Sequence, residues 1–280
     1  MTQEVCTKPR TVFVDGDLLP YKVGFATQTS LYRLDKVGRE TCSPAFIFRG
    51  KTGMNRVLKI DPEFDVTERF FVEEPIQAIE TLKLALQNIV KGSRCEIFKV
   101  VISGDTNFRD EVATIQPYKG NRTDFVKPVH WQLLRDWLAD KPYTIITDNE
   151  EADDVISRAM IAGHVGATID KDLNNTPGDH YNFNKGEHYH VTEAEANRNF
   201  YLQLLTGDTA DHIPGIRGIG PAKAGKALPE GLSPSEMESR VLSFYEEAYG
   251  PDRAVAALRE VGQLLWMRRE EGEMWEPIVN

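Results

Sequence analysis

Acidic side chains follow four short apolar segments of this 280-residue chain. Residues 11–14, 97–102, 143–147 and 165–169 have the length and the residue types of buried strands. The acids behind them are Asp15, Asp105, Asp148, Glu150, Glu151, Asp153, Asp154, Asp170 and Asp172. Carboxylate oxygens are the ligands that Mg²⁺ and Mn²⁺ prefer. Two such ions about 4 Å apart would suit an in-line attack of water on a phosphodiester.

Helical patterns separate most of these segments and must position the acids. Residues 74–90, 129–138 and 152–162 repeat apolar side chains at helical spacing, with Pro75 suited to a first turn and Gly92 to a stop. Strands alternating with helices predict an α/β fold with a mostly parallel central sheet flanked by helices. Ligands bind such sheets beyond the carboxyl ends of the strands, where the acids would gather.

The acids also have an ordinary explanation, because the N-terminus of a helix favours negative charge. Four such placements at one sheet edge are harder to explain in this way, since clustered carboxylates repel one another. Bound cations would compensate that repulsion. Asp17, Asp148 and Glu150 are interpreted as bystanders near the site.

A second segment, residues 204–228, joins two more acids to a glycine-rich turn. Its acids are Asp208 and Asp211, its glycines include Gly215, Gly218 and Gly220, and its basic residues are Arg217, Lys223 and Lys226. Glycines let a backbone approach a phosphate closely, and a following helix N-terminus attracts it. The segment therefore suits sequence-independent phosphate binding. A plain loop between helices is the alternative, whereas a dinucleotide-binding loop is disfavoured because the spacing is not G-x-G-x-x-G.

The segment after Asp105 carries basic and aromatic side chains. Its members within residues 113–135 are Lys119, Arg122, Lys127, Arg135, Tyr118, Phe125 and Trp131. Basic side chains can bind the phosphate backbone and aromatic rings can stack on the bases, so this composition suits a single strand of nucleic acid. An ordinary solvated loop and helix would also explain this composition.

Composition limits the class of protein. Hydrophobic residues make up 41% and charged residues 27%, the balance of a soluble globular chain. No apolar run approaches the roughly 18 residues of a membrane span, and the N-terminus lacks the pattern of a signal peptide. Cys6, Cys42 and Cys95 form neither a disulfide framework nor a C-x-x-C pair, so we expect a reducing cytoplasm. The net charge of −10 contrasts with the basic character of simple DNA-binding modules.

Taken in order, these motifs resemble the 5′ nuclease (flap endonuclease) superfamily, and most closely its stand-alone bacteriophage 5′→3′ exonucleases. The matching motifs are Val-Asp15-Gly, Gly-Asp105 with Phe108-Arg109, Tyr118-Lys119-Gly-Asn-Arg122, Glu151-Ala-Asp153-Asp154-Val, Asp170-Lys-Asp172-Leu, and Thr-Gly-Asp208-Thr-Ala-Asp211-His-Ile-Pro-Gly-Ile-Arg-Gly-Ile-Gly. The resemblance implies one PIN-like nuclease domain over residues 1–280. Its parts would be a catalytic core at 11–205 with a helical arch or clamp at about 106–135, a helix–turns–helix element at 206–230, and C-terminal helices at 231–280.

The resemblance also assigns roles to residues. Asp15, Asp105, Glu151 and Asp153 would hold the catalytic metal with Asp154 beside them, and Asp170, Asp172, Asp208 and Asp211 would hold a second ion. Lys119 and Arg122 would contact the scissile phosphate with support from Arg109. Tyr118 and the element from Gly215 to Lys226 would contact DNA, the latter with a K⁺ ion as in some relatives. The nine carboxylates account for nine negative charges, so the remaining surface is nearly neutral and the acidic total does not exclude DNA.

The expected protein is a metal-dependent 5′→3′ exonuclease that uses Mg²⁺ or Mn²⁺ and leaves 5′-phosphate products. Its partners would be duplex DNA ends, 5′ flaps and RNA primers, without a membrane, and it would act as a monomer in the cytoplasm of a phage-infected cell during DNA replication or recombination. A PIN-type ribonuclease and a non-catalytic DNA-structure-binding protein are the alternatives.

Three segments have no place in these motifs. Residues 29–73 contain strand and turn patterns around 45–48, Gly50 and Gly53, which predict an insertion or an edge hairpin. His188 and His190 fit alternation in a short strand better than a transition-metal site. Residues 235–249 and 253–269 predict two amphipathic helices that pack against the core.

Overall fold

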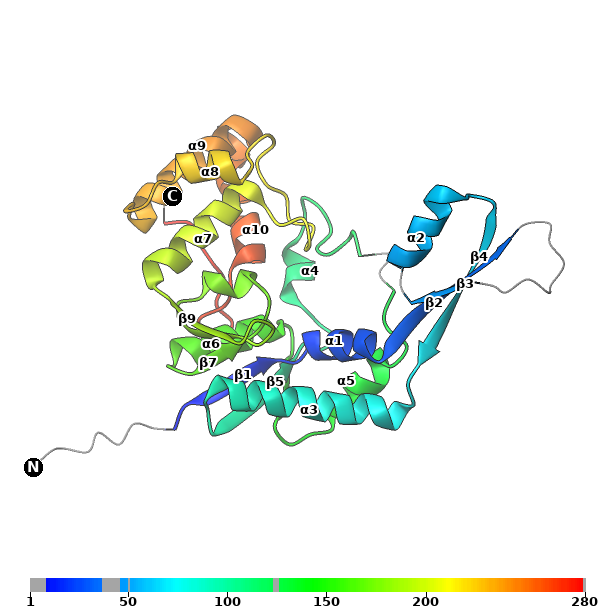
Figure 1. Ribbon diagram of the computed structural model, residues 1–280. Coiled ribbons are helices and arrows are strands. Elements are labelled where there is room, and N and C mark those ends of the chain that lie inside the picture. Colours follow the sequence, from blue (N-terminus) through cyan, green and yellow to red (C-terminus); the bar gives the residue numbers. More distant parts are fainter. Residues whose placement is uncertain (1–8, 37–45, 50, 123–125, 279–280) are drawn as a thin grey trace, which may run out of the picture. The chain divides into compact units, whose positions relative to one another are not determined.

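The computed structural model describes residues 9–36, 46–49, 51–122 and 126–278 (Figure 1). Cys6, Cys42, Gly50 and Phe125, to which the sequence analysis refers, lie outside these residues, as does Ala45. The chain divides into two compact units. The first comprises Met1–Asp17, Gln87–Phe125 and Ala139–Asn280, and the second comprises Leu18–Leu86 and Val126–Leu138.

A six-stranded sheet forms the centre of the first unit. Its strands are β1 (Thr11–Asp15), β5 (Ile97–Ile102), β6 (Thr144–Ile146), β7 (Val165–Ala167), β8 (Gly178–Asn182) and β9 (Glu187–Val191). They are ordered β6-β5-β1-β7-β8-β9, and every pair is parallel except β8–β9. The four strands expected from the sequence are all present and mutually parallel, which confirms the α/β class.

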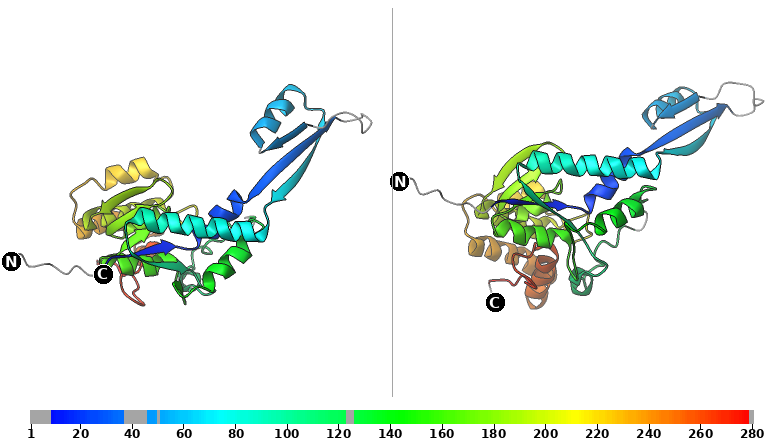
Figure 2. Two further views of the ribbon diagram at one scale, coloured as in Figure 1. Left: turned by 60° about the horizontal axis from the view of Figure 1, so that its bottom comes forward. Right: turned by 90° about the horizontal axis from the view of Figure 1, so that it is seen from below.

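Helix α6 (Ala152–Ile161) packs against one face of this sheet (Figure 2). Of α3 (Pro75–Ser93), the part from Gln87 onward belongs to this unit. Ile156 and Met160 of α6 pack against Val101 of β5 in a buried cluster. The expected stop of α3 at Gly92 is wrong, because the helix continues to Ser93. Gly92 instead leaves room for Tyr181, whose hydroxyl a Cβ at that position would overlap.

A helical layer built mainly from the C-terminal part completes the first unit. It contains α7 (Glu193–Thr206), α8 (Pro221–Ala227), α9 (Pro234–Tyr249) and α10 (Pro251–Leu265), which share a hydrophobic core with Tyr118 and Trp275. The short α4 (Phe108–Val112) contacts α10. Both expected C-terminal helices exist, but the second ends at Leu265 rather than at residue 269, and Trp266 already has extended backbone angles.

The second unit has a small sheet of its own. β3 (Phe46–Arg49), β2 (Gln28–Lys36) and β4 (Phe64–Val72) form a three-stranded antiparallel sheet in the order β3-β2-β4. Helix α2 (Lys51–Ile60) covers one face of it, while α1 (Leu18–Ala26) and α5 (Trp131–Ala139) also contribute residues to this unit. Residues 29–73 are therefore an insertion with a separate sheet, not a hairpin at the edge of the central one. In the described ranges, no helix has the length and apolarity needed to cross a membrane.

Candidate metal centre

Asp15 lies at the carboxyl end of the central strand. Strand β1 pairs with β5 on one side and β7 on the other, so Asp15 stands at the point where the strand order reverses, where open α/β sheets bind ligands. Its carboxylate is 4% exposed and accepts a 2.8 Å hydrogen bond from Thr168 Oγ1. Burial and the nearby charges of Asp17 and Asp170 raise the pKa of Asp15 to about 7.

Asp153 is in the first turn of α6 and faces the same group of acids. Its Oδ1 atom is buried and has no hydrogen-bond partner among the described residues. Burial raises the pKa of Asp153 well above its usual range, and the charges of Asp15, Asp170 and Glu151 add to the shift. A buried carboxylate oxygen without a donor, among other carboxylates, is the environment that a bound cation relieves.

A second group of acids lies next to the first. Burial, the charge of Asp170 and a side-chain bond with Asp208 raise the pKa of Asp172 to about 7. Asp208 is itself buried in the turn after α7, where its Oδ1 accepts a 2.7 Å bond from the amide of Ala210. Because Asp170 acts on both Asp15 and Asp172, it links the two groups.

Basic side chains neutralise the remaining acids at this edge. Lys119 Nζ lies 2.5 Å from Glu151 Oε1 and 3.7 Å from Asp211 Oδ2, and Arg122 also pairs with Asp211. Burial lowers the pKa of Lys119, but the charges of Glu151 and Asp211 outweigh it and raise the pKa overall. The hydroxyl of buried Tyr118 lies 3.0 Å from Glu151 Oε2 and 2.9 Å from Asp211 Oδ2. Lys119 and Tyr118 therefore connect acids from both expected metal clusters.

Arg109 and Asp154 form a buried ion pair in the protein interior. Arg109 is 1% exposed and donates to both oxygens of Asp154, at 2.6 and 2.9 Å, and to the carbonyl oxygens of Leu264 and Trp266. Asp154 also accepts from the amides of Glu151 and Arg268, so each of its oxygens already has two donors. Although burial raises the pKa of Asp154, Arg109 outweighs that effect and holds it below its usual value. This geometry departs from the expectation that Arg109 supports phosphate contacts and that Asp154 assists a metal.

Four other residues named in the sequence analysis differ in exposure and in their distance from the acidic groups. Asp105 lies just beyond β5 at the same sheet edge, and its side chain is exposed. Tyr118 is 8% exposed, so its ring is unavailable to stack on a base. Asp17, interpreted as a bystander, accepts from the amide of Ser103 and acts on Asp15, whereas Glu150 pairs with Arg158 away from the acidic groups.

The glycine-rich element forms a tight turn between α7 and α8. A Cβ at Gly215 would overlap the carbonyl of Thr206, so only glycine permits this approach. Gly218 has a φ of 82°, and Gly220 is the N-cap residue of α8. The side chains of Arg217, Lys223 and Lys226 are exposed. The turn thus joins α7 to α8 within the segment expected to be a helix–turns–helix element, and its three basic side chains lie on the surface.

The sequence analysis missed three polar residues that orient the acids. Thr168 donates to Asp15, Asn107 Nδ2 donates to Glu151 at 3.0 Å, and Gln203 Nε2 donates to Asp172 at 2.7 Å. Thr168 could have been found, because it lies at a strand end two residues before Asp170. Asn107 and Gln203 carry no such signal, since their roles depend on how distant segments meet.

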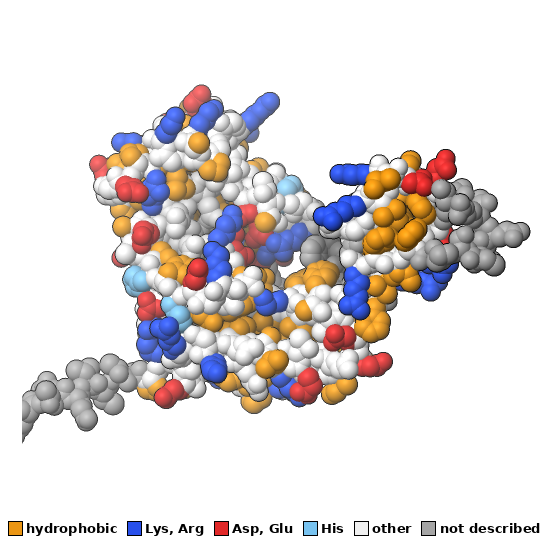
Figure 3. Space-filling model, viewed as in Figure 1, with side chains coloured by type: hydrophobic (Ala, Val, Ile, Leu, Met, Phe, Trp, Pro, Cys, Tyr) orange, Lys and Arg blue, Asp and Glu red, His pale blue; other side chains and the backbone are white. Residues whose placement is uncertain are grey.

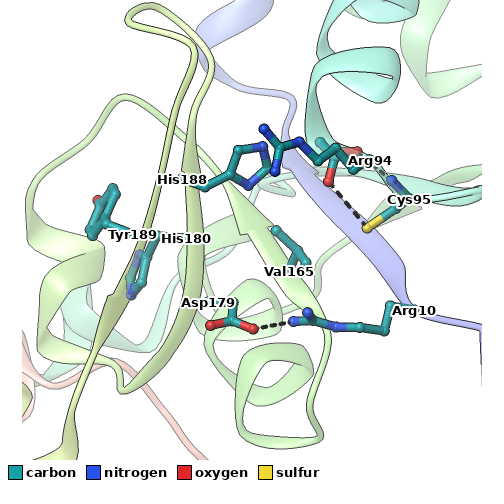
Figure 4. A pocket seen from close by; sticks show the side chains of 9 residues that line it. Arg10, Arg94, Cys95, Val165, Asp179, His180, His188 and Tyr189 are labelled. Carbon is teal, nitrogen blue, oxygen red and sulfur yellow. Dashed lines mark hydrogen bonds and ion pairs between the residues drawn. The ribbon is translucent and has the colours of Figure 1, made fainter. Parts of the chain in front are cut away.

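A separate pocket of about 340 Å³ is lined by residues that precede β1 and β5 and by residues of β7, β8 and β9 (Figure 4). Arg10 and His190 both bind Asp179, and His188 Nε2 donates to the carbonyl of Gly92 at 2.8 Å. The two histidines lie in β9, as the expected alternation in a short strand requires. Cys95 beside them is a free thiol.

The acidic residues fit a divalent metal. They supply only oxygen ligands, the type that Mg²⁺ and Mn²⁺ prefer, and a buried oxygen of Asp153 has no donor. Nowhere in the described part of the chain do three acidic, histidine or cysteine side chains already form a ligand cage. Glu151 and Asp211 would have to exchange Lys119 for an ion.

Solved structures of bacteriophage T5 proteins resemble this chain, whereas no family model matches it. A D15 flap endonuclease variant in complex with DNA and metal ions is 15% identical, with a TM-score of 0.50 over 91% of this chain and 94% of that one. T5 5′-exonuclease with bound zinc is 17% identical, with a TM-score of 0.48 over 91% and 95%. A further exonuclease variant is 14% identical, with a TM-score of 0.47 over 92% and 95%. The chain therefore shares its fold with the T5 D15 flap endonuclease, which is the α/β fold that its sequence motifs predicted.

Proposed function

We propose that the protein is a metal-dependent 5′→3′ exonuclease that acts on 5′ ends of duplex DNA and also removes 5′ flaps and RNA primers. The observation that carries the proposal is the group of Asp15, Asp153 and Asp170 at the strand-order reversal, with a buried carboxylate oxygen that lacks a donor. The T5 proteins of the same fold are an exonuclease and a flap endonuclease that bind metal ions and DNA.

The acids would hold two Mg²⁺ or Mn²⁺ ions. Asp15, Glu151, Asp153 and the exposed Asp105 would bind one of them, and Asp170, Asp172, Asp208 and Asp211 would bind the other. When bound, the ions supply an activated water and stabilise the charge that develops on the phosphate. Thr168 and Gln203 keep Asp15 and Asp172 oriented toward the site.

Lys119 and Arg122 would exchange their carboxylate partners for oxygens of the scissile phosphate. Their cations then stabilise the negative charge that develops in the transition state. Arg109 and Asp154 do not touch the substrate in this scheme. They fix the start of α6 through the Asp154 carboxylate, and so they position Asp153 and Glu151.

The helix–turns–helix element would bind the duplex backbone. Arg217, Lys223 and Lys226 are exposed, and the amides around Gly218 and Gly220 can approach phosphates closely. These contacts do not read bases, so binding would be independent of sequence and would weaken with salt. A K⁺ ion at the turn would be an additional ligand of this element.

The test uses a duplex labelled internally and at one 5′ end, incubated with Mg²⁺, Mn²⁺ or EDTA, beside a matched flap and an RNA–DNA hybrid. Metal-dependent release of 5′-terminal nucleotides is the expected result, and the relative rates rank the substrates. Tight duplex binding without cleavage of any substrate would refute the proposal and favour a structural DNA-binding protein. Cleavage confined to single-stranded RNA would favour a PIN-type ribonuclease.

A further inference from the structure

The small sheet of the second unit has one covered and one uncovered face. On the covered face, Tyr32 and Leu34 of β2 pack against Met54 of α2. The strand pairs place the alternate residues on the other face, because side chains of a strand alternate between faces. Ile47 of β3 and Phe71 of β4 are 66% and 60% exposed there.

Arginines stand on the same uncovered face. Leu31 of β2 pairs with Arg49 of β3 and with Arg69 of β4, so the two arginines flank an apolar residue in one row across the sheet. With neighbouring strands about 4.8 Å apart, their Cα atoms are separated by roughly 10 Å. Both side chains are exposed, and neither has a carboxylate partner among the residues that the structure describes. Arg33 of the same face pairs with Asp35.

The charge of this unit differs from that of the whole protein. It contains twelve Lys and Arg and ten Asp and Glu, a net charge of +2 in a chain of −10. Residues 46–60, which form β3 and α2, include Arg49, Lys51, Arg56 and Lys59 without any acid; of these, Arg49 is on the uncovered face and the other three are on α2, which covers the opposite face. Figure 3 shows basic side chains beside a hydrophobic patch on the surface of this unit. The charge therefore favours an anionic partner.

We propose that this face, made of Ile47, Arg49, Arg69 and Phe71, binds single-stranded nucleic acid without sequence preference. Guanidinium groups without partners can bind backbone phosphates, and an exposed ring that stands out of a sheet can stack on a base. The choice of a single strand over another polyanion rests on the proposed function, whose flap substrates carry one. The site would be distinct from the acidic residues of the first unit and would need no metal.

The experiment measures fluorescence anisotropy of a labelled oligothymidine with the full-length protein in EDTA, which prevents cleavage. The double variant R49E/R69E is expected to weaken binding about tenfold or more, and to reduce the slope of log K against log salt by about 1.4, the loss of two phosphate contacts. F71A, which leaves the charge unchanged, is expected to weaken binding about fivefold or more. The matched control K91E/K185E changes the net charge by the same amount at two exposed lysines outside this face. It should bind oligothymidine as the wild type does.

Other outcomes separate this inference from the proposed function. Circular dichroism confirms that each variant is folded. Equal binding by R49E/R69E, F71A and the control overturns the inference even if the protein cleaves DNA normally. If R49E/R69E and F71A lose oligothymidine binding as expected but the wild-type protein cleaves no substrate, the inference stands and the proposed nuclease function is refuted. Vesicles of anionic lipid form a second arm, and loss of vesicle binding with intact oligothymidine binding would overturn the proposed partner.

Discussion

The ammonium of Lys119 lies 2.5 Å from Glu151 Oε1, so a cation of the protein occupies the carboxylate that a metal ion would need. The same ammonium is 3.7 Å from Asp211 in the second acidic group. A lysine at this place competes with metal ions in the absence of substrate. In the proposed mechanism a phosphate would draw this ammonium away, whereas Asp211 would still pair with Arg122 and Glu151 would keep its bond from Tyr118.

Replacing Lys119 with Met should separate metal binding from catalysis. Without the competing ammonium, Glu151 is expected to bind Mn²⁺ several-fold more tightly, as measured by isothermal titration calorimetry. Cleavage is expected to fall by about 100-fold or more, because a donor to the transition state is lost. Lys185→Met, at an exposed turn, is the control. Weaker Mn²⁺ binding in the Lys119 variant would contradict the competition.

Replacing Asp153 with Asn should abolish cleavage while stabilising the metal-free protein. The change removes a carboxyl whose ionisation is opposed by its burial and by the charges of Asp15, Asp170 and Glu151, so Tm in EDTA is expected to rise. Cleavage with Mg²⁺ should fall by about 100-fold or more, because a metal ligand is lost. Asp140→Asn makes the same chemical change on the surface and should alter neither quantity. Retained cleavage would exclude Asp153 as a ligand.

The metal-free protein should become less stable as pH rises, and bound metal should oppose this loss. Asp15 and Asp172 have a pKa of about 7 in the folded protein, whereas the ordinary pKa of an aspartate is 3.8. Between these values the folded protein holds protons that the unfolded chain has released, so the metal-free protein loses stability as pH rises through this window. Because Mg²⁺ replaces those protons, it should raise Tm more at about pH 8 than at about pH 5.5. Equal shifts at both values would argue against these two acids as ligands.

Breaking the Arg109–Asp154 pair should destabilise the fold. Arg109→Met would leave a fully buried carboxylate without its cation, a loss of roughly 3–5 kcal/mol in the free energy of unfolding. The double variant R109M/D154L removes both charges and should recover much of this loss. Urea denaturation measures both variants. A mild effect in the single variant would mean that water reaches Asp154.

The glycines of the helix–turns–helix element allow a controlled comparison. Gly215→Ala would force a Cβ into the carbonyl of Thr206, so it should lower both the free energy of unfolding and duplex affinity. Gly225→Ala, within α8, meets open space and should be neutral or stabilise the protein by about 0.4–1 kcal/mol. If both variants had the same Tm, the turn would be looser than its backbone contacts indicate.

The sequence predicted the sheet and the gathering of acids because both depend on local patterns. An apolar strand followed at once by Asp15 or Asp170 needs only parallel pairing to bring the acids to one edge. Lys119 was singled out on its motif, but its contact with Glu151 depends on how segment 116–122 meets the turn at 208–212. Such a contact between segments far apart in the sequence cannot be predicted from local sequence patterns.

Arg109 shows what motif reasoning leaves out. Its place between Asp105 and Lys119 suggested that it supports Lys119 and Arg122, but the carbonyls that fix it come from Leu264 and Trp266, more than 150 residues away. For residues 29–73 the sequence left an insertion and an edge hairpin open for another reason. The nine-residue ladder between β2 and β4 pairs segments that are separated by a helix and a third strand, so no local turn signal distinguishes the two.

The backbone amide of Arg268 and the carbonyl of Trp266 complete the hydrogen bonds of the buried Arg109–Asp154 pair. During synthesis on the ribosome, the acids from Asp15 to Asp211 therefore emerge before the segment that holds α6 in place. A nascent chain shorter than residue 268 would carry every proposed ligand but not the support that positions Asp153. The start of α6 would therefore reach its final hydrogen bonds only after residue 268 has been synthesised.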